Sequence, residues 1–85
     1  MRRLNDFVQE HNTYFGKFVG MWDLNNANDR QAIAQEIDCQ LSPENLHCDG
    51  EISNTEAMRK LRRLNAVAKE LLALDPTLTI YEYYA

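Results

Sequence analysis

Apolar and aromatic side chains recur every three or four positions along the first quarter of the chain. At 100° per residue they fall within a helical wedge of roughly 120°, and polar residues occupy the other side. This apolar set is Leu4, Phe7, Val8, His11, Phe15, Phe18, Val19 and Trp22. The pattern predicts an amphipathic helix over about residues 3–20 with an aromatic face. Gly16 and Gly20 lie on its polar side and weaken its C-terminal end.

A narrower apolar stripe follows a turn-rich connector at residues 23–28. The stripe predicts a shorter helix over about residues 29–41, with Asn28 as its N-cap. Its members are Ile33, Ala34, Ile37 and Leu41. The pair Ser42-Pro43 is expected to end this helix, because the residue before a proline disfavours helical backbone angles.

A third helix is predicted over residues 54–74. The run Ser53-Asn54-Thr55-Glu56 has the spacing of a capping box, and Asp75-Pro76 is a stop signal. One face of this helix carries the apolar side chains Ala57, Met58, Leu61, Leu64, Ala68, Leu71 and Leu72.

The tail at residues 76–85 is rich in β-branched and aromatic residues, which favour an extended conformation. A lone strand has no partner in a helical chain, so the tail is expected either to dock on its own bundle or to contact another molecule. The fold class is therefore all-α: residues 1–85 form a single domain, a small three-helix bundle with two long helices and one shorter helix. The first and third helices are expected to pack antiparallel.

Composition sets limits on this domain. Its 85 residues lie near the lower end of chains that fold without help, and 45% apolar with 26% charged residues argue against disorder. No apolar run could span a bilayer, and no continuous apolar stretch follows Arg2 and Arg3 as in a signal peptide. A cytoplasmic location is therefore expected, in which Cys39 and Cys48 would remain thiols.

The net charge of −4 is distributed unevenly. Acidic residues dominate from Asp23 to Glu56, where Arg30 is the only base, and basic residues gather at Arg2 and Arg3 and again on the third helix. Several solvated surfaces explain this pattern more simply than a binding polarity does.

The residues give little support to metal or catalytic chemistry. His11, Cys39, His47 and Cys48 have the right side chains for zinc, but they lack the close paired spacing of structural zinc sites. No glycine-rich phosphate loop is present, and adjacent residues such as His47 and Cys48 rarely form a catalytic dyad. We therefore expect no metal, no cofactor and no enzymatic activity.

These observations favour a non-catalytic protein-binding module: a small acidic adaptor, regulator or inhibitor that occupies a partner's surface. Such short acidic chains are common among accessory proteins of phages and mobile elements, although composition alone suggests that origin. The candidate partner-binding residues are Trp22, Tyr81, Tyr83 and Tyr84 as aromatic anchors, with Asp49 and Glu51 for charge. The aromatic face is large for so small a chain, so a homodimer is also expected.

The alternative is a nucleic-acid-binding regulator. Four basic residues within five positions of the third helix could follow a phosphate backbone. These are Arg59, Lys60, Arg62 and Arg63. Their directions spread around the helix and the protein is acidic overall, which makes this the less favoured function.

Overall fold

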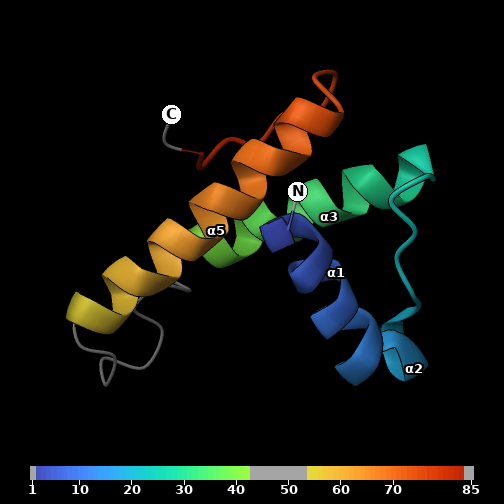
Figure 1. Ribbon diagram of the computed structural model, residues 1–85, viewed down its shortest axis with the longest axis horizontal. Coiled ribbons are helices and arrows are strands. Elements are labelled where there is room, and N and C mark those ends of the chain that lie inside the picture. The colour runs from blue at the N-terminus through green and yellow to red at the C-terminus, as the bar shows by residue number, and fades with distance from the viewer. Residues whose placement is uncertain (1, 43–53, 84–85) are drawn as a thin grey trace.

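The computed structural model describes residues 2–42 and 54–83, and within these ranges all regular secondary structure is helical. The helices are α1 (Arg2–Tyr14), α2 (Gly16–Val19), α3 (Ala27–Leu41) and α5 (Asn54–Leu74) (Figure 1). The predicted fold class, a small all-α bundle, is confirmed. None of these helices is both long enough and apolar enough to cross a membrane.

The longest helix, α5, packs against both α1 and α3 (Figure 1). Polar contacts join α1 to α5: the backbone N–H of Arg3 donates to Glu70 at 3.2 Å, and Arg63 forms an ion pair with Glu10. As α1 advances from residue 3 to residue 10, its partners on α5 run backwards from 70 to 63. The contacts thus run in opposite order along the two helices, but Figure 1 shows α1 crossing α5 steeply and not lying alongside it as the predicted antiparallel pair.

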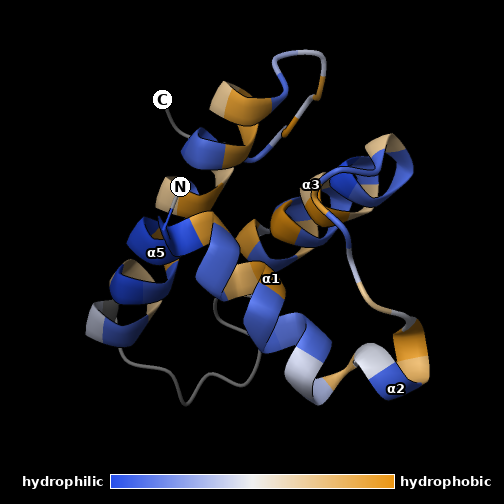
Figure 2. Cartoon of the chain, turned by 45° about the vertical axis from the view of Figure 1, so that its right-hand side comes forward, coloured by the Kyte–Doolittle hydropathy of each residue, from blue (hydrophilic) through white to orange (hydrophobic). Residues whose placement is uncertain are grey.

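The hydrophobic core lies where the apolar stripes of the three longer helices meet. Figure 2 shows these stripes on the inner sides of the bundle, with further apolar residues on α2 at its outside. The buried cluster is Leu4, Phe7, Val8, Ile33, Ala34, Ile37, Leu41, Leu64, Val67, Ala68, Leu71 and Ile80. Burial of such side chains contributes roughly 1.5–3 kcal/mol each, so the core is the main source of stability.

Helix α3 begins two residues earlier than predicted. Its N-cap is Asn26 rather than Asn28, and the Asn26 side chain accepts hydrogen bonds from the N–H groups of Asn28 and Asp29. Asn26 has extended backbone angles, which let an Asn side chain reach these donors. The helix ends at Leu41 as expected, because Ser42 before the proline is extended.

Helix α5 has the predicted bounds, and Asp75 organises the turn that follows it. The Asp75 carboxylate accepts hydrogen bonds from the backbone N–H and the hydroxyl of Thr77 and from the Arg30 guanidinium, the last at 2.9 Å. The Thr77 hydroxyl and then Arg30 hold the pKa of Asp75 below its ordinary value. Arg30 also donates to the carbonyl of Leu24 in the connector before α3. This one side chain on α3 therefore contacts both that connector and the end of α5.

The described part of the tail docks on its own bundle as an irregular strap. Ile80 is 7% exposed and belongs to the core cluster, and Leu78 and Tyr83 pack against it. The Asp38 carboxylate on α3 accepts the N–H groups of Tyr81 and Glu82 at 3.0 and 2.8 Å. A side chain of the bundle thus supplies the acceptors that a neighbouring strand would otherwise provide.

The predicted first helix, 3–20, is interrupted. Helix α1 ends at Tyr14, Phe15 forms a turn, and the single helical turn α2 follows. The first predicted helix was expected to be longer than the second. Instead α1 has 13 residues, and α3, which corresponds to the second predicted helix, has 15. Phe15, Phe18 and Val19 of the predicted aromatic face are consequently exposed.

Candidate protein-binding surface

Several large apolar and aromatic side chains are exposed at the outer end of the first helical region. Five large side chains between Tyr14 and Met21 are mostly exposed. They are Tyr14 (69%), Phe15 (56%), Phe18 (86%), Val19 (72%) and Met21 (70%). We call these five side chains the 14–21 surface. Single exposed apolar residues are common, but a cluster of this size generally marks an interaction site.

The backbone reverses direction at Gly20 to produce this surface. Gly20 has a φ of 107°, a conformation that residues with a side chain rarely adopt. The chain then returns along α1 and brings Trp22 back onto it. The short α2 is thereby held out beyond the end of α1 (Figure 1).

Polar side chains of α1 fasten the returning segment. The Asn12 side chain accepts the N–H of Trp22 at 2.7 Å and donates to the Trp22 carbonyl at 3.0 Å. His11 Nε2 lies 3.1 Å from the Gly20 carbonyl oxygen, and because a carbonyl can only accept, this nitrogen carries the proton. Three hydrogen bonds therefore fix residues 20–22 to α1.

Aromatic stacking adds to this attachment. The rings of His11 and Trp22 are stacked with their centroids 3.4 Å apart and their planes at 5°, and Phe7 lies on Trp22 at 5.9 Å. Trp22 is half-buried and packs against the core. The 14–21 surface is thus displayed by a segment anchored at both ends.

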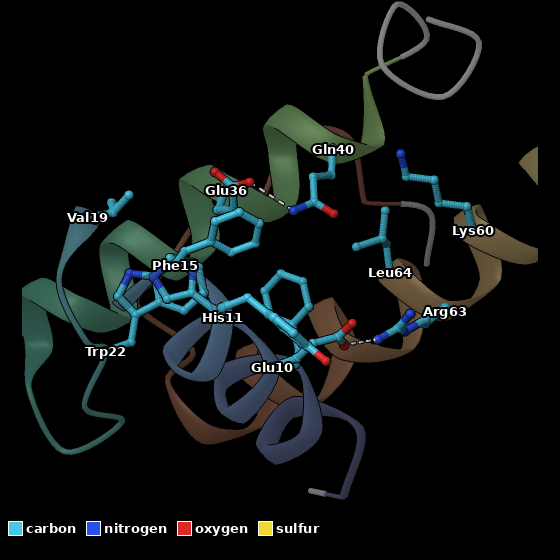
Figure 3. Close-up of a pocket in the computed structure, with 12 residues that line it drawn as sticks. Glu10, His11, Phe15, Val19, Trp22, Glu36, Gln40, Lys60, Arg63 and Leu64 are labelled. Carbon is cyan, nitrogen blue, oxygen red and sulfur yellow. Dashed lines mark hydrogen bonds and ion pairs between the residues drawn. The ribbon is translucent and has the colours of Figure 1, made fainter. Parts of the chain in front are cut away.

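A groove of about 770 Å³ opens beside this surface, between α1, α3 and the first half of α5 (Figure 3). Its apolar walls come from Phe7, Phe15, Val19, Trp22 and Leu64. Its polar lining is Glu10, His11, Tyr14, Glu36, Gln40, Lys60 and Arg63. Such a volume is typical of ligand pockets, and apolar walls with charges of both signs also suit a protein side chain.

Two polar pairs are visible at the groove (Figure 3). Arg63 binds Glu10 across the α1–α5 side, and Gln40 donates to Glu36 at 2.8 Å along α3. Glu36 is partly buried, and within residues 2–42 and 54–83 it forms no ion pair. The α3 wall therefore presents a carboxylate that a cation could still neutralise.

The predicted partner-binding residues do not gather at one place. Trp22 lines the groove instead of projecting from the surface. On the tail, Tyr81 is 85% exposed and Tyr83 is half-buried against the core. The predicted positions Tyr84, Asp49 and Glu51 lie outside the described residues.

The four basic residues of the nucleic-acid alternative divide into two pairs. Lys60 and Arg63 line the groove, and Arg63 is paired with Glu10. Arg59 and Arg62 are exposed on α5. The four side chains therefore do not form one basic stripe.

The histidine and cysteine residues considered for zinc are not brought together where the structure describes them. His11 is engaged with Trp22 and Gly20, and Cys39 is exposed on α3. Over residues 2–42 and 54–83, no three His, Cys, Asp or Glu side chains form a group that could hold a metal ion. His47 and Cys48 lie outside these ranges.

Sequence reasoning missed the exposed residues Tyr14, Phe18 and Met21 as a candidate site. The helical periodicity placed Phe18 on the apolar face. The same apolar spacing continues past Tyr14, where α1 ends, so the spacing alone does not mark the end of the helix. The available signal was the pair Gly16 and Gly20, since two glycines four residues apart weaken a helix at the point where the chain turns.

No protein-family model, curated protein or solved structure matches this chain.

Proposed function

We propose that this protein is a non-catalytic protein-binding module that acts by presenting the 14–21 surface to another protein chain. The observation that carries the proposal is the exposure of five large side chains within residues 14–21, on a segment tied to α1. The free energy falls when a partner covers water-exposed aromatic side chains. Aromatic residues and Met are also enriched at protein interfaces.

The anchoring of residues 20–22 indicates that the exposed segment has a fixed conformation, which supports a role in binding. A surface held by hydrogen bonds and ring stacking loses little conformational entropy when a partner covers it. Asn12 and His11 make these contacts with Trp22 and Gly20. The partner therefore meets a shape that already exists in the free protein.

The mechanism proposed is steric occupancy, as expected for an adaptor, regulator or inhibitor. Phe18 is the central anchor because it is 86% exposed and its loss would leave the core unchanged. Association between two copies of the chain would use the same side chains. The nucleic-acid function receives less support, because Arg63 is already paired with Glu10, and Lys60 lines the groove together with apolar and acidic side chains.

The test compares associations made by the wild-type chain, Phe18→Ser and Met58→Ser. Met58 is a matched control because it is an exposed apolar residue, at 47%, on α5 outside the 14–21 surface. Chemical cross-linking in the source cells, followed by mass spectrometry, should give links between residues 14–21 and a partner chain in the wild type and Met58→Ser. Phe18→Ser should lose these links. Retention of every wild-type link by Phe18→Ser would show that the surface is not the binding site.

A further inference from the structure

The 14–21 surface contains a projecting side chain directly beside a concavity. Phe18 projects from α2 and does not line the groove, whereas its neighbour Val19 and the nearby Phe15 do. Five apolar side chains line part of the groove, and its volume of about 770 Å³ is ample for a phenyl ring. One molecule thus carries both a projection and a receptacle of matching chemistry.

We propose that a second copy of this chain covers the 14–21 surface, with Phe18 of each copy seated in the groove of the other. The inference rests on the proposed function and specifies its partner. In a twofold dimer the same patch of both subunits forms the interface, so a projection and its receptacle must lie close together on one subunit. Their adjacency at Val19 meets this condition and favours a closed dimer over an open head-to-tail chain.

The apolar area available agrees with what a stable dimer needs. Taking about 200 Å² for a whole aromatic residue, the exposed fractions of Tyr14, Phe15 and Phe18 correspond to on the order of 400 Å². Val19 and Met21 are exposed by 72% and 70% and extend this area. A standard interface takes about 800 Å² from each partner, including its polar rim. The 14–21 surface could therefore form the apolar centre of such an interface, and the walls of the groove could supply much of the remainder.

Charge also suits a second copy. Lys17 is exposed and directly precedes Phe18, while Glu36 on the groove wall has no ion-pair partner within residues 2–42 and 54–83. When Phe18 enters the partner's groove, Lys17 comes to the edge of that groove. A Lys17–Glu36 contact would then form twice, once on each side of the twofold axis.

The experiment measures the mass of the full-length chain by sedimentation equilibrium and by light scattering over a range of concentrations. The expected mass of the wild type is twice 9.9 kDa. Phe18→Ser should weaken the dimer by about thirtyfold or more, the usual effect of removing a central anchor. Met58→Ser should remain dimeric, and circular dichroism should show the same helix content for all three proteins.

A charge exchange tests the predicted pairing. Lys17→Glu and Glu36→Lys should each weaken the dimer by about tenfold, because each places like charges together. The chain with both substitutions should recover most of the lost affinity, because the pair is restored with reversed signs. Failure of the double variant to recover would overturn this arrangement of the two copies.

Two further outcomes separate the second-copy proposal from the proposed function. A wild-type chain that stays at 9.9 kDa at high concentration overturns the second copy. The proposed function is then tested by the cross-links to a different protein. It is supported if Phe18→Ser loses them and overturned if Phe18→Ser keeps them. A dimer that Phe18→Ser leaves intact overturns the assignment of this surface to the second copy.

Discussion

The substitution Ile80→Ala tests whether the tail is part of the folded bundle. Ile80 is 7% exposed within the core cluster, and the next residue, Tyr81, is 85% exposed. Replacing a buried Ile by Ala generally costs 2–5 kcal/mol, and a position on an irregular strap that can relax should lie near about 2 kcal/mol. Tyr81→Ala should change stability by less than about 0.5 kcal/mol. Its backbone hydrogen bond to Asp38 is retained.

The assay is urea unfolding followed by circular dichroism at one fixed protein concentration, because association would make the apparent stability depend on concentration. With a slope of about 1 kcal/mol per molar urea for so small a domain, Ile80→Ala should lower the midpoint by about 2 M. The Tyr81→Ala midpoint should lie close to that of the wild type. Equal midpoints for Ile80→Ala and the wild type would refute docking of the tail on the core.

Two other contacts give separate predictions. Asn12→Ala removes both hydrogen bonds to the Trp22 backbone and should cost about 1–3 kcal/mol, with a shift of tryptophan emission to longer wavelength as Trp22 becomes more exposed; unchanged emission would contradict the attachment. Asp75→Asn should destabilise the protein at pH 7, because Thr77 and Arg30 lose an ionised acceptor whose pKa they hold below 3.8. A lowered folded-state pKa stabilises the protein above the unfolded pKa, and this contribution is lost as pH falls through the folded value, so urea midpoints of the two proteins should converge well below pH 4. A constant difference down to pH 2 would exclude this linkage.

The helices with strong local signals could be predicted from the sequence. The end of α3 at Leu41 and both ends of α5 agree with the expected positions. Each end follows from short-range chemistry, such as a proline that restricts the residue before it. The N-cap of α3 was misplaced by two residues because its connector contains Asn at 25, 26 and 28. The sequence could not show which of these side chains accepts hydrogen bonds from the N–H groups at the start of the helix.

The interruption of the first helix could not be predicted in the same way. Periodicity records which side chains share a helical face, and it carries no information about where the helix leaves the core. The turn depends on contacts between residues ten apart, such as the two hydrogen bonds between Asn12 and Trp22. These contacts and the stacking of His11 on Trp22 compete with continuation of a helix already weakened at Gly16.

The docking of the tail also depends on a contact that is distant in sequence. The sequence left open whether the tail straps onto the bundle or reaches a partner. The structure places Ile80 in the core, and Asp38, more than 40 residues earlier, accepts the N–H groups of Tyr81 and Glu82. An acidic residue on a predicted helix gives no sign of such a role, since most such residues are solvated.

The contacts that shape the 14–21 surface are separate from the side chains that it exposes. Trp22, Asn12 and His11 hold the returning chain against α1, whereas Phe18 is 86% exposed and takes no part in the buried core. A change at Phe18 should therefore remove binding while the fold remains, and a change at Asn12 should disturb both. This separation makes the proposed function open to test, because the loss of association in Phe18→Ser can be distinguished from the loss of the structure that presents it.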